Sequence, residues 1–254
     1  MDIRNLSAVI TGGGSGMGAE TARYLAKAGA KVALLDVNLD GAQKVAQETG
    51  GIALNCDVTS EASAKDALDK AAAHNGTPRI LINCAGIAPG ARIVGREGPH
   101  DLALFNKTIG VNLVGSFNML RLAANLMSQA EPLNDDGERG VIINTASVAA
   151  YEGQIGQAAY SASKGGIVGM TLPAARELAR FGIRVVTIAP GLIETPMLGG
   201  MSDEVQKSLI ATTIFPQRLG KASEYAKLAL HIIDNALING ETIRMDGAVR
   251  LAPK

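Results

Sequence analysis

The sequence predicts an α/β fold in one domain: a doubly wound sheet of seven parallel strands with helices on both faces. Seven short apolar segments rich in β-branched residues recur along the chain, separated by segments with helical spacing. Most are apolar at nearly every position, which is typical of parallel strands buried between two helical layers. A length of 254 residues is ordinary for a single α/β domain. We therefore expect residues 1–254 to form one unit.

The predicted elements alternate along the chain. Strands are expected at residues 7–11, 31–35, 51–55, 79–83, 141–145, 183–189 and 241–245. Helices are expected at residues 17–28, 40–48, 61–73, 102–129, 157–180 and 223–234. Pro173 lies inside the fifth helix, where a missing backbone donor costs about 3 kcal/mol and should bend the helix.

Three segments do not fit this alternation: 87–100, 131–139 and 191–220. Loops of this length are usually functional or mobile. The last is rich in apolar residues, namely Leu192, Ile193, Met197, Leu198, Met201, Ile214 and Phe215. Two interpretations are equally open, a lid that covers the substrate or a helical pair that packs on a neighbouring subunit.

Composition narrows the range of partners. Lys plus Arg and Asp plus Glu both number 24, so the overall charge favours neither nucleic acid nor a membrane surface. The two cysteines and three histidines are scattered, which argues against a disulfide framework and a metal site. No apolar run approaches the roughly 20 residues that cross a bilayer, and no targeting segment precedes the first strand. We expect a cytoplasmic protein with a small-molecule substrate; the mitochondrial matrix is the alternative compartment.

A glycine-rich loop follows the first predicted strand and opens the first helix. It reads Thr11-Gly-Gly-Gly-Ser-Gly-Met-Gly18. Glycines such as Gly12, Gly16 and Gly18 let the backbone approach a pyrophosphate, and the helix N-terminus supplies free N–H groups. An ordinary tight turn is the alternative. The context of strand, loop and helix favours a dinucleotide site.

Asp36 ends the second predicted strand, twenty residues after Gly16. A carboxylate there accepts hydrogen bonds from the ribose hydroxyls of a dinucleotide, whereas a 2′-phosphate would bring like charges together. The sequence therefore predicts NAD rather than NADP as the cofactor. A solvated strand end is the alternative for Asp36.

The next two strands also end in candidate cofactor contacts, because ligands of such sheets bind at the carboxyl ends of the strands. Asp57 and Val58 are expected to flank the adenine. Cys84, Ala85 and Gly86 are expected to let the backbone lie against the ribose. For Cys84 we expect a small buried apolar side chain rather than a reactive thiol.

Tyr160 and Lys164 are candidates for proton transfer, since a spacing of four residues places both on one helix face. A phenol with a pKa of about 10 is a poor base near neutrality. An ammonium about 4 Å away can lower that pKa by two to three units, whereas burial raises it. Tyr160 is therefore expected to act only with Lys164 beside it. A solvated helix face is the alternative for such a pair.

Two further polar residues complete the expected catalytic set. Ser147 follows a strand thirteen residues before Tyr160 and is expected to hydrogen-bond the substrate oxygen. Asn112, inside the predicted long helix, is expected to hold a water that passes protons to Lys164. Together with the glycine loop, the four residues indicate an oxidoreductase.

These motifs resemble the short-chain dehydrogenase/reductase family over the whole chain. The motifs are Thr11-Gly12-x-x-x-Gly16-x-Gly18, Asn83-Cys-Ala-Gly86, Asn112, Ser147, Tyr160-x-x-x-Lys164 and Pro190-Gly191. Cys84 stands where the family commonly has Asn. The resemblance implies a Rossmann fold and a homotetramer, with hydride passing to the nicotinamide and the proton to Tyr160.

Residues 139–176 and 215–220 are similar to the 3-hydroxyacyl-CoA dehydrogenases of this family. This similarity implies interconversion of 3-hydroxyacyl-CoA and 3-oxoacyl-CoA. It also implies substrate contacts at Ser147, Gln157 and Tyr160. The implied NAD contacts are Ser15, Met17, Asp36, Asp57, Val58, Cys84, Tyr160, Lys164, Pro190, Ile193 and Thr195.

Other functions stay open. A steroid or another apolar secondary alcohol would suit the apolar segment after Gly191 equally well. Asp36 disfavours a 3-oxoacyl-carrier-protein reductase, which typically uses NADPH. An NAD-binding scaffold without turnover is the alternative from another class, but such proteins tend to lose catalytic residues and this chain keeps all four.

Overall fold

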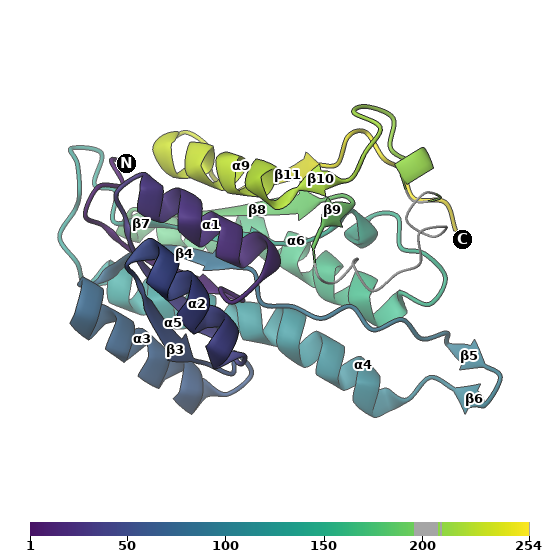
Figure 1. The fold of residues 1–254 in the computed structure, drawn as a ribbon. Coiled ribbons are helices and arrows are strands. Elements are labelled where there is room, and N and C mark those ends of the chain that lie inside the picture. Colours follow the sequence, from purple (N-terminus) through teal and green to yellow (C-terminus); the bar gives the residue numbers. More distant parts are fainter. Residues whose placement is uncertain (196–207, 209, 254) are drawn as a thin grey trace.

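The computed structural model describes residues 1–195, 208 and 210–253, and it is built on a seven-stranded sheet (Figure 1). The strand order is β11-β8-β7-β4-β1-β2-β3, and all neighbouring pairs are parallel. The strands are β1 (Ser7–Thr11), β2 (Lys31–Asp36), β3 (Ile52–Asn55), β4 (Pro78–Asn83), β7 (Gly140–Thr145), β8 (Ile183–Pro190) and β11 (Thr242–Met245). The predicted fold class is confirmed, and each predicted strand is found to within one residue at either end.

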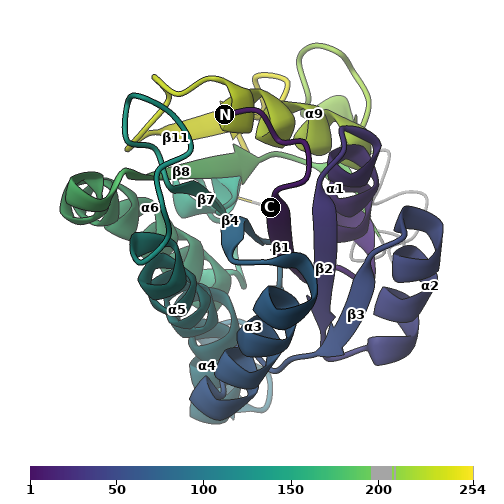
Figure 2. The same ribbon diagram turned by 90° about the vertical axis from the view of Figure 1, so that its left-hand side faces the viewer.

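Helices cover both faces of the sheet (Figure 2). One layer contains α1 (Gly16–Lys27), α2 (Leu39–Thr49) and α9 (Ala222–Asp234). The other contains α3 (Glu61–Asn75), α4 (Leu102–Ile109), α5 (Gly115–Ser128) and α6 (Ala158–Leu178). Short 3₁₀ helices lie at Val148–Ala150 and Ala179–Phe181.

Alternate strand residues enter the two cores, as the strand period of two requires. Ile10 of β1 packs in the core under α1 and α9, and its neighbour Val9 packs in the core under α3 and α5. The central strands β1, β7 and β8 are buried at every position, whereas β3 and β11 at the sheet edges are half-buried. The continuous apolar runs in the sequence therefore mark central strands.

The order of the strands places a crevice beside β1. From β1 the chain adds β2 and then β3 on one side, and it then crosses over to add β4 on the other side of β1. The helices after β1 and β4 leave the sheet in opposite directions at this point, which opens a crevice at the carboxyl ends of the two strands. Thr11 and Asn83 are paired at that edge of the sheet.

The predicted helix 102–129 is interrupted, which corrects the sequence-based expectation. A π-helical turn, Gly110–Val114, separates α4 from α5. The hydroxyl of Ser116 donates to the carbonyl of Asn112 at 2.6 Å, and the Asn112 side chain binds residues outside the helix. Such single wide turns are frequent at functional sites.

α6 continues as an α-helix through Pro173. The carbonyl that loses its donor belongs to Gly169, four residues earlier, and both Gly169 and Pro173 are exposed. Water can therefore bind this carbonyl, which reduces the cost of the missing hydrogen bond. Solvent therefore offsets part of the cost of Pro173 in this helix.

The segments that did not fit the predicted alternation contain short strands. β5 (Val94–Gly95) and β6 (Gly98–Pro99) form a small antiparallel hairpin within 87–100 (Figure 1). β9 (Ile193–Glu194) pairs with β10 (Gly220–Lys221), which joins the two ends of the segment 191–220. Met197, Leu198 and Met201, on which the expected lid partly depends, lie outside the described residues. The choice between lid and interface stays a prediction.

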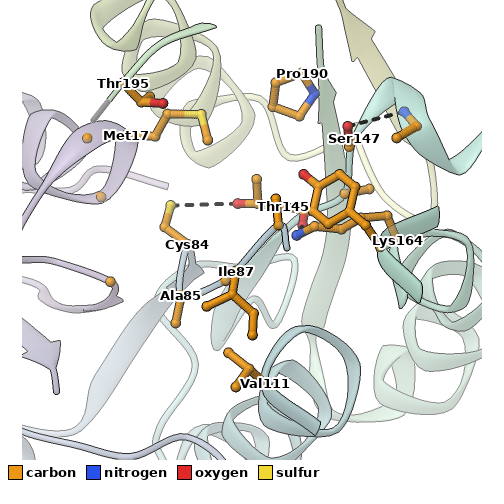
Figure 3. Close-up of a pocket in the computed structure, with 18 of the residues that line it drawn as sticks. Met17, Cys84, Ala85, Ile87, Val111, Thr145, Ser147, Lys164, Pro190 and Thr195 are labelled. Carbon is orange, nitrogen blue, oxygen red and sulfur yellow. Dashed lines mark hydrogen bonds between the residues drawn. The ribbon is translucent and has the colours of Figure 1, made fainter. Parts of the chain in front are cut away.

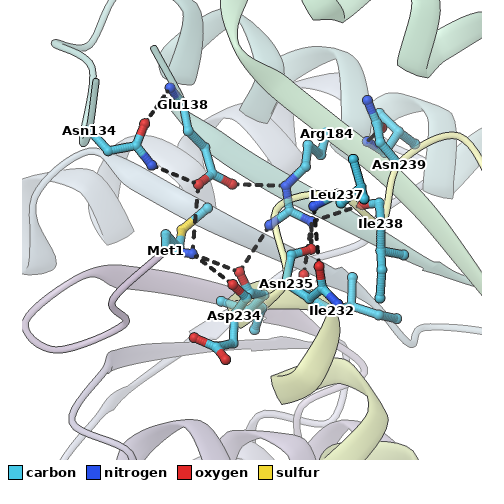
Figure 4. A network of polar contacts seen from close by, with 12 residues as sticks. Met1, Asn134, Glu138, Arg184, Ile232, Asp234, Asn235, Leu237, Ile238 and Asn239 are labelled. Carbon is cyan, nitrogen blue, oxygen red and sulfur yellow. Dashed lines mark hydrogen bonds and ion pairs between the residues drawn. The ribbon is translucent and has the colours of Figure 1, made fainter. Parts of the chain in front are cut away.

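A buried ion pair holds the sheet edge remote from the crevice (Figure 4). Arg184, near the start of β8, donates to the carboxylate of Glu138 at 2.8 Å. Its guanidinium also donates to the carbonyls of Ile232 and Ile233 in the last turn of α9, and to those of Asn235 and Ile238 in the segment that follows. A cation at a helix C-terminus binds carbonyls that lack helical partners. Arg184 therefore joins the segment 131–139, β8 and α9.

Within the described residues, no helix is both long enough and apolar enough to cross a bilayer.

Candidate active site

A cavity of about 1190 Å³ opens at the carboxyl ends of the central strands (Figure 3). It brings together residues that are scattered along the sequence. Every predicted site residue except Asn112 lines it: Gly12, Ser15, Gly16, Met17, Gly18, Asp36, Asp57, Val58, Cys84, Ala85, Gly86, Ser147, Gln157, Tyr160, Lys164, Pro190, Ile193 and Thr195.

The glycine loop brings backbone atoms to the cavity wall. Gly12 and Gly16 have φ angles of 64° and 53°, in the left-handed region that favours glycine. A Cβ on Gly18 would lie 2.2 Å from the carbonyl oxygen of Gly12, and a Cβ on Gly12 would lie 2.8 Å from the amide nitrogen of Ala85. Side chains at these positions would force the loop apart. Ser15 makes no side-chain hydrogen bond to the start of α1, so its hydroxyl leaves the first N–H groups of the helix free for a ligand.

The carboxylate of Asp36 is held at one end of the cavity. The amide of Gly14 donates to its Oδ2 atom and the amide of Asn38 to its Oδ1 atom, each at 2.9 Å. These two bonds fix the orientation of the carboxylate and leave further lone pairs on both oxygens. Asp36 can therefore accept hydrogen bonds from a bound ligand without rearrangement.

The loop after β4 is fixed by Thr11, whose hydroxyl accepts hydrogen bonds from the amides of Cys84 and Ala85, each at 3.2 Å. The Cys84 sulfur lies 3.6 Å from the hydroxyl oxygen of Thr145 and 3.7 Å from that of Tyr225. Burial raises the pKa of the Cys84 thiol. A protonated thiol in such surroundings agrees with the predicted packing role.

Tyr160 and Ser147 meet at the other end of the cavity. The Ser147 hydroxyl hydrogen-bonds the Tyr160 phenol, which favours the ionised phenol, but burial outweighs this effect and raises the pKa of Tyr160. The hydroxyl of Ser147 also accepts a hydrogen bond from the amide of Ala149 at 3.1 Å. A serine and a tyrosine are thus oriented toward one point, where they can bind a substrate oxygen.

Lys164 is buried beneath Tyr160. Its ammonium donates to the carbonyl of Thr145 at 2.6 Å and lies 5.8 Å from the centre of the Tyr160 ring. Burial lowers the pKa of Lys164 to about 8. The ammonium is directed to the carbonyl of Thr145, and burial has the largest effect on the pKa of both groups. That Lys164 lowers the pKa of Tyr160 stays a prediction.

Asn112 does not line the cavity but hydrogen-bonds residues of its wall and of α6. Its side chain accepts from the amide of Ile87 at 2.8 Å, and it donates to the carbonyl of Ile87 at 2.9 Å and to the hydroxyl of Ser163 at 3.0 Å. A Cβ on Gly86 would lie 3.2 Å from its Oδ1 atom and 3.7 Å from the Lys164 ammonium nitrogen. Both polar atoms of the side chain have protein partners, and Oδ1 keeps a second lone pair. The role of Asn112 in holding a water stays a prediction.

Sequence reasoning missed several lining residues. Thr145 was predicted only as the end of a strand, yet it binds Lys164 through its carbonyl. Gln154 and Leu251 line the cavity although neither belongs to a recognisable motif. No local pattern could have identified Leu251, since it reaches the cavity only through the tertiary fold.

Comparison with known proteins identifies the family of this chain. A family model described as short chain dehydrogenase matches residues 7–206. The 3-hydroxyacyl-CoA dehydrogenase type-2 of Rattus norvegicus is 51% identical over 258 residues, covering 99% of this chain and 97% of the relative. That of Drosophila melanogaster is 49% identical, covering 99% and 100%. The crystal structure of 3-hydroxyacyl-CoA dehydrogenase type-2 from Mycobacterium avium superimposes with a TM-score of 0.93 at 40% identity, covering 98% of each chain.

Proposed function

Because the chain belongs to the short-chain dehydrogenase family, we propose that it interconverts 3-hydroxyacyl-CoA and 3-oxoacyl-CoA with NAD as cofactor. The observation that carries this proposal is the single cavity with the glycine loop and Asp36 at one end and Ser147 and Tyr160 at the other. The proposed substrate is that named for relatives 51% and 49% identical to this chain, the 3-hydroxyacyl-CoA dehydrogenases type-2.

The residues present fit a dinucleotide. Gly12 and Gly18 form a cradle that a Cβ would fill, and the start of α1 offers free N–H groups to a pyrophosphate. The fixed carboxylate of Asp36 suits two ribose hydroxyls and disfavours a 2′-phosphate by like-charge repulsion. Asp57, Val58, Cys84, Ala85 and Gly86 would hold the adenosine half, and Ser15, Met17, Pro190, Ile193 and Thr195 the remainder. NAD, when bound, supplies the hydride acceptor.

Side chains of this protein carry out the proton transfer. Tyr160 takes the hydroxyl proton of the alcohol as its C–H bond is broken, and it returns a proton to the carbonyl oxygen in the reverse direction. Ser147 hydrogen-bonds the same substrate oxygen and holds it against the phenol. Lys164 carries a titratable proton beneath the ring, with a pKa of about 8. Positive charge on the bound cofactor would add to that of Lys164 in favouring the phenolate.

For the assembly, we propose a homotetramer. Val114 and Phe117, on consecutive turns around the start of α5, are 50% and 52% exposed, and Leu172 on α6 is 44% exposed. Exposed apolar side chains on α5 and α6 favour contact with another subunit. Light scattering after size-exclusion chromatography tests this proposal, and a monomer would contradict it.

An NADH-coupled assay on a substrate panel tests the proposed reaction. The panel contains acetoacetyl-CoA, longer 3-oxoacyl-CoA thioesters and ketosteroids. We expect kcat/KM for at least one thioester to exceed that for every ketosteroid by at least about tenfold, which corresponds to 1.4 kcal/mol. Higher kcat/KM for the ketosteroids would overturn the proposed substrate.

A further inference from the structure

A cluster of four charged side chains lies beside the cavity and has no part in the steps above. Arg244, in β11, makes two hydrogen bonds to the carboxylate of Glu152, at 2.7 and 2.9 Å, and one to Asp246 at 2.7 Å. Arg250 adds contacts to Asp246 at 3.3 Å and to Glu152 at 3.4 Å. The side chains of Arg244, Glu152 and Asp246 are 24%, 23% and 10% exposed. Partly buried bidentate pairs of this kind hold geometry better than solvent-exposed pairs.

The cluster binds two segments that are distant in sequence. Glu152 belongs to the segment 151–157, which leads into α6 and Tyr160. Arg244 also donates to the carbonyl of Val249 at 3.1 Å, and Val249 is fully buried. The charges therefore fasten residues 249–253 against the segment 151–157.

Two hydrogen bonds complete the attachment. The amide of Ile155 donates to the carbonyl of Pro253, and the side-chain amide of Gln154 donates to the carbonyl of Ala252, each at 3.0 Å. The side-chain oxygen of Gln157 in turn accepts from the amide of Gln154 at 3.0 Å. Residues 249–253 and 151–157 thus form one connected piece of the structure.

This piece forms part of the cavity wall. Leu251, Gln154 and Gln157 all line the cavity. In the strand order, β11 and β8 lie toward one edge of the sheet, and β2, which carries Asp36, lies toward the other. The wall therefore belongs to the end that holds Ser147 and Tyr160, not to the adenosine end.

We propose that Leu251 is a specificity-determining residue that limits the length of the substrate chain, and that Arg244 is a positioning residue that holds Leu251 in the wall. This inference rests on the proposed function, because it concerns the alcohol-binding end of the same cavity. A branched apolar side chain projecting from a fixed segment excludes or contacts an acyl chain according to its length. A one-methylene difference in an apolar pocket changes kcat/KM by about 10 to 200-fold.

Leu251→Ala and Leu251→Phe test the wall directly. The measured quantity is the ratio of kcat/KM for a ten-carbon 3-oxoacyl-CoA to that for acetoacetyl-CoA. We expect Leu251→Ala to raise this ratio by about tenfold and Leu251→Phe to lower it by about tenfold, the lower limit for a methylene-sized change. Leu237→Ala is the matched control, since Leu237 is 93% exposed and does not line the cavity. Ratios that stay within twofold of wild type in both Leu251 variants, with NADH binding intact, would overturn the inference.

A failure of the proposed role of Leu251 can be distinguished from a failure of the proposed function. A wild-type enzyme that reduces none of the thioesters would overturn the proposed substrate. The same variants are then assayed with 2-alkanones of increasing length, which need no CoA. If the ratio of kcat/KM for long and short 2-alkanones changes in the Leu251 variants, the proposed role of Leu251 is supported. An unchanged ratio overturns that role.

Arg244→Met tests the positioning residue. We expect the length ratio to approach that of Leu251→Ala, with KM raised for the long substrate, kcat for acetoacetyl-CoA within about twofold and NADH affinity unchanged. Arg244→Lys should restore part of the discrimination because it keeps one charged contact. Arg23→Met is the control, because Arg23 pairs with Glu48 and Glu20 outside the cavity. An Arg244→Met enzyme with the wild-type length ratio would overturn the role of Arg244.

Discussion

The ammonium of Lys164 donates to the carbonyl of Thr145 at 2.6 Å, while the centre of the Tyr160 ring lies 5.8 Å away. The hydrogen bond of the Lys164 ammonium in this structure therefore goes to the Thr145 carbonyl, and the ring of Tyr160 lies within reach of its charge only. Burial disfavours the charged form of both residues, raising the pKa of Tyr160 and lowering that of Lys164 to about 8. In the proposed reaction, the positive charge of bound NAD would favour the ionised form of the phenol.

Tyr160→Phe removes the group that exchanges the proton with the substrate. We expect kcat to fall by about 10² to 10⁴-fold, the usual contribution of general acid–base catalysis. NADH affinity, measured by fluorescence titration, should change by less than about twofold because the ring remains. Tyr151→Phe is the matched control, since Tyr151 is 48% exposed and does not line the cavity. Activity of Tyr160→Phe within tenfold of wild type would contradict the assigned proton transfer.

Lys164→Met should change the pH dependence of stability. The pKa of Lys164 is lowered from 10.5 to about 8, so the folded state binds fewer protons than the unfolded state between these values. Burial of the charge therefore destabilises the wild type fully below pH 8, and the penalty disappears as the pH rises toward 10.5. The upper limit is about 3 kcal/mol, and loss of the hydrogen bond to Thr145 offsets about 1 kcal/mol.

Thermal unfolding of both proteins between pH 7 and 10 measures this effect. We expect the Tm of Lys164→Met relative to that of wild type to be highest at pH 7 and to decline above pH 8. Lys227→Met, at an exposed position of α9, is the control for loss of a lysine charge. A Tm difference that is independent of pH would show that Lys164 titrates at its ordinary pKa.

The strands and most helices were predictable because their signals are local. The strand Val141–Thr145 is apolar along most of its length, since both faces of β7 are buried. The break between α4 and α5 was not predictable. It accompanies the contacts of Asn112 with Ile87 and Ser163, which lie 25 and 51 residues away in the sequence. The helical spacing of apolar residues does not reveal contacts with residues so distant in the sequence.

The residues of the candidate site likewise include some that local motifs predict and some that they do not. Gly12, Asp36 and Tyr160 belong to motifs in which a short spacing encodes the geometry, and all three line the cavity. Leu251 has no such motif. It enters the wall because Gln154 binds the carbonyl of Ala252, 98 residues later. The direction of the Lys164 ammonium likewise depends on the carbonyl of Thr145, which a motif of side chains does not encode.

Asp36→Asn tests the cofactor preference. The amide keeps the shape of the carboxylate and one acceptor oxygen, but it removes the charge that would repel a 2′-phosphate. We expect the ratio of kcat/KM for NADH to that for NADPH to fall by at least about tenfold, since like charges about 4 Å apart repel by about 4 kcal/mol at an intermediate dielectric. Asp40→Asn is the control, because Asp40 lies in the first turn of α2 and does not line the cavity. A wild-type enzyme that prefers NADPH would contradict the assignment of Asp36.

Arg184→Met tests the buried ion pair at the remote edge of the sheet. The side chains of Arg184 and Glu138 are 7% and 5% exposed, so loss of the guanidinium leaves a buried carboxylate and several carbonyls without this donor. We expect the free energy of unfolding to fall by about 3 to 5 kcal/mol, the usual cost of breaking a buried pair.

Denaturation by urea measures this free energy, with Arg4→Met as the control because the Arg4 side chain is 75% exposed. The KM for NADH in the protein that remains folded should stay near that of wild type, because the pair lies at the start of β8 and the cavity at its carboxyl end. A loss below 1 kcal/mol would show that water replaces the guanidinium at these carbonyls.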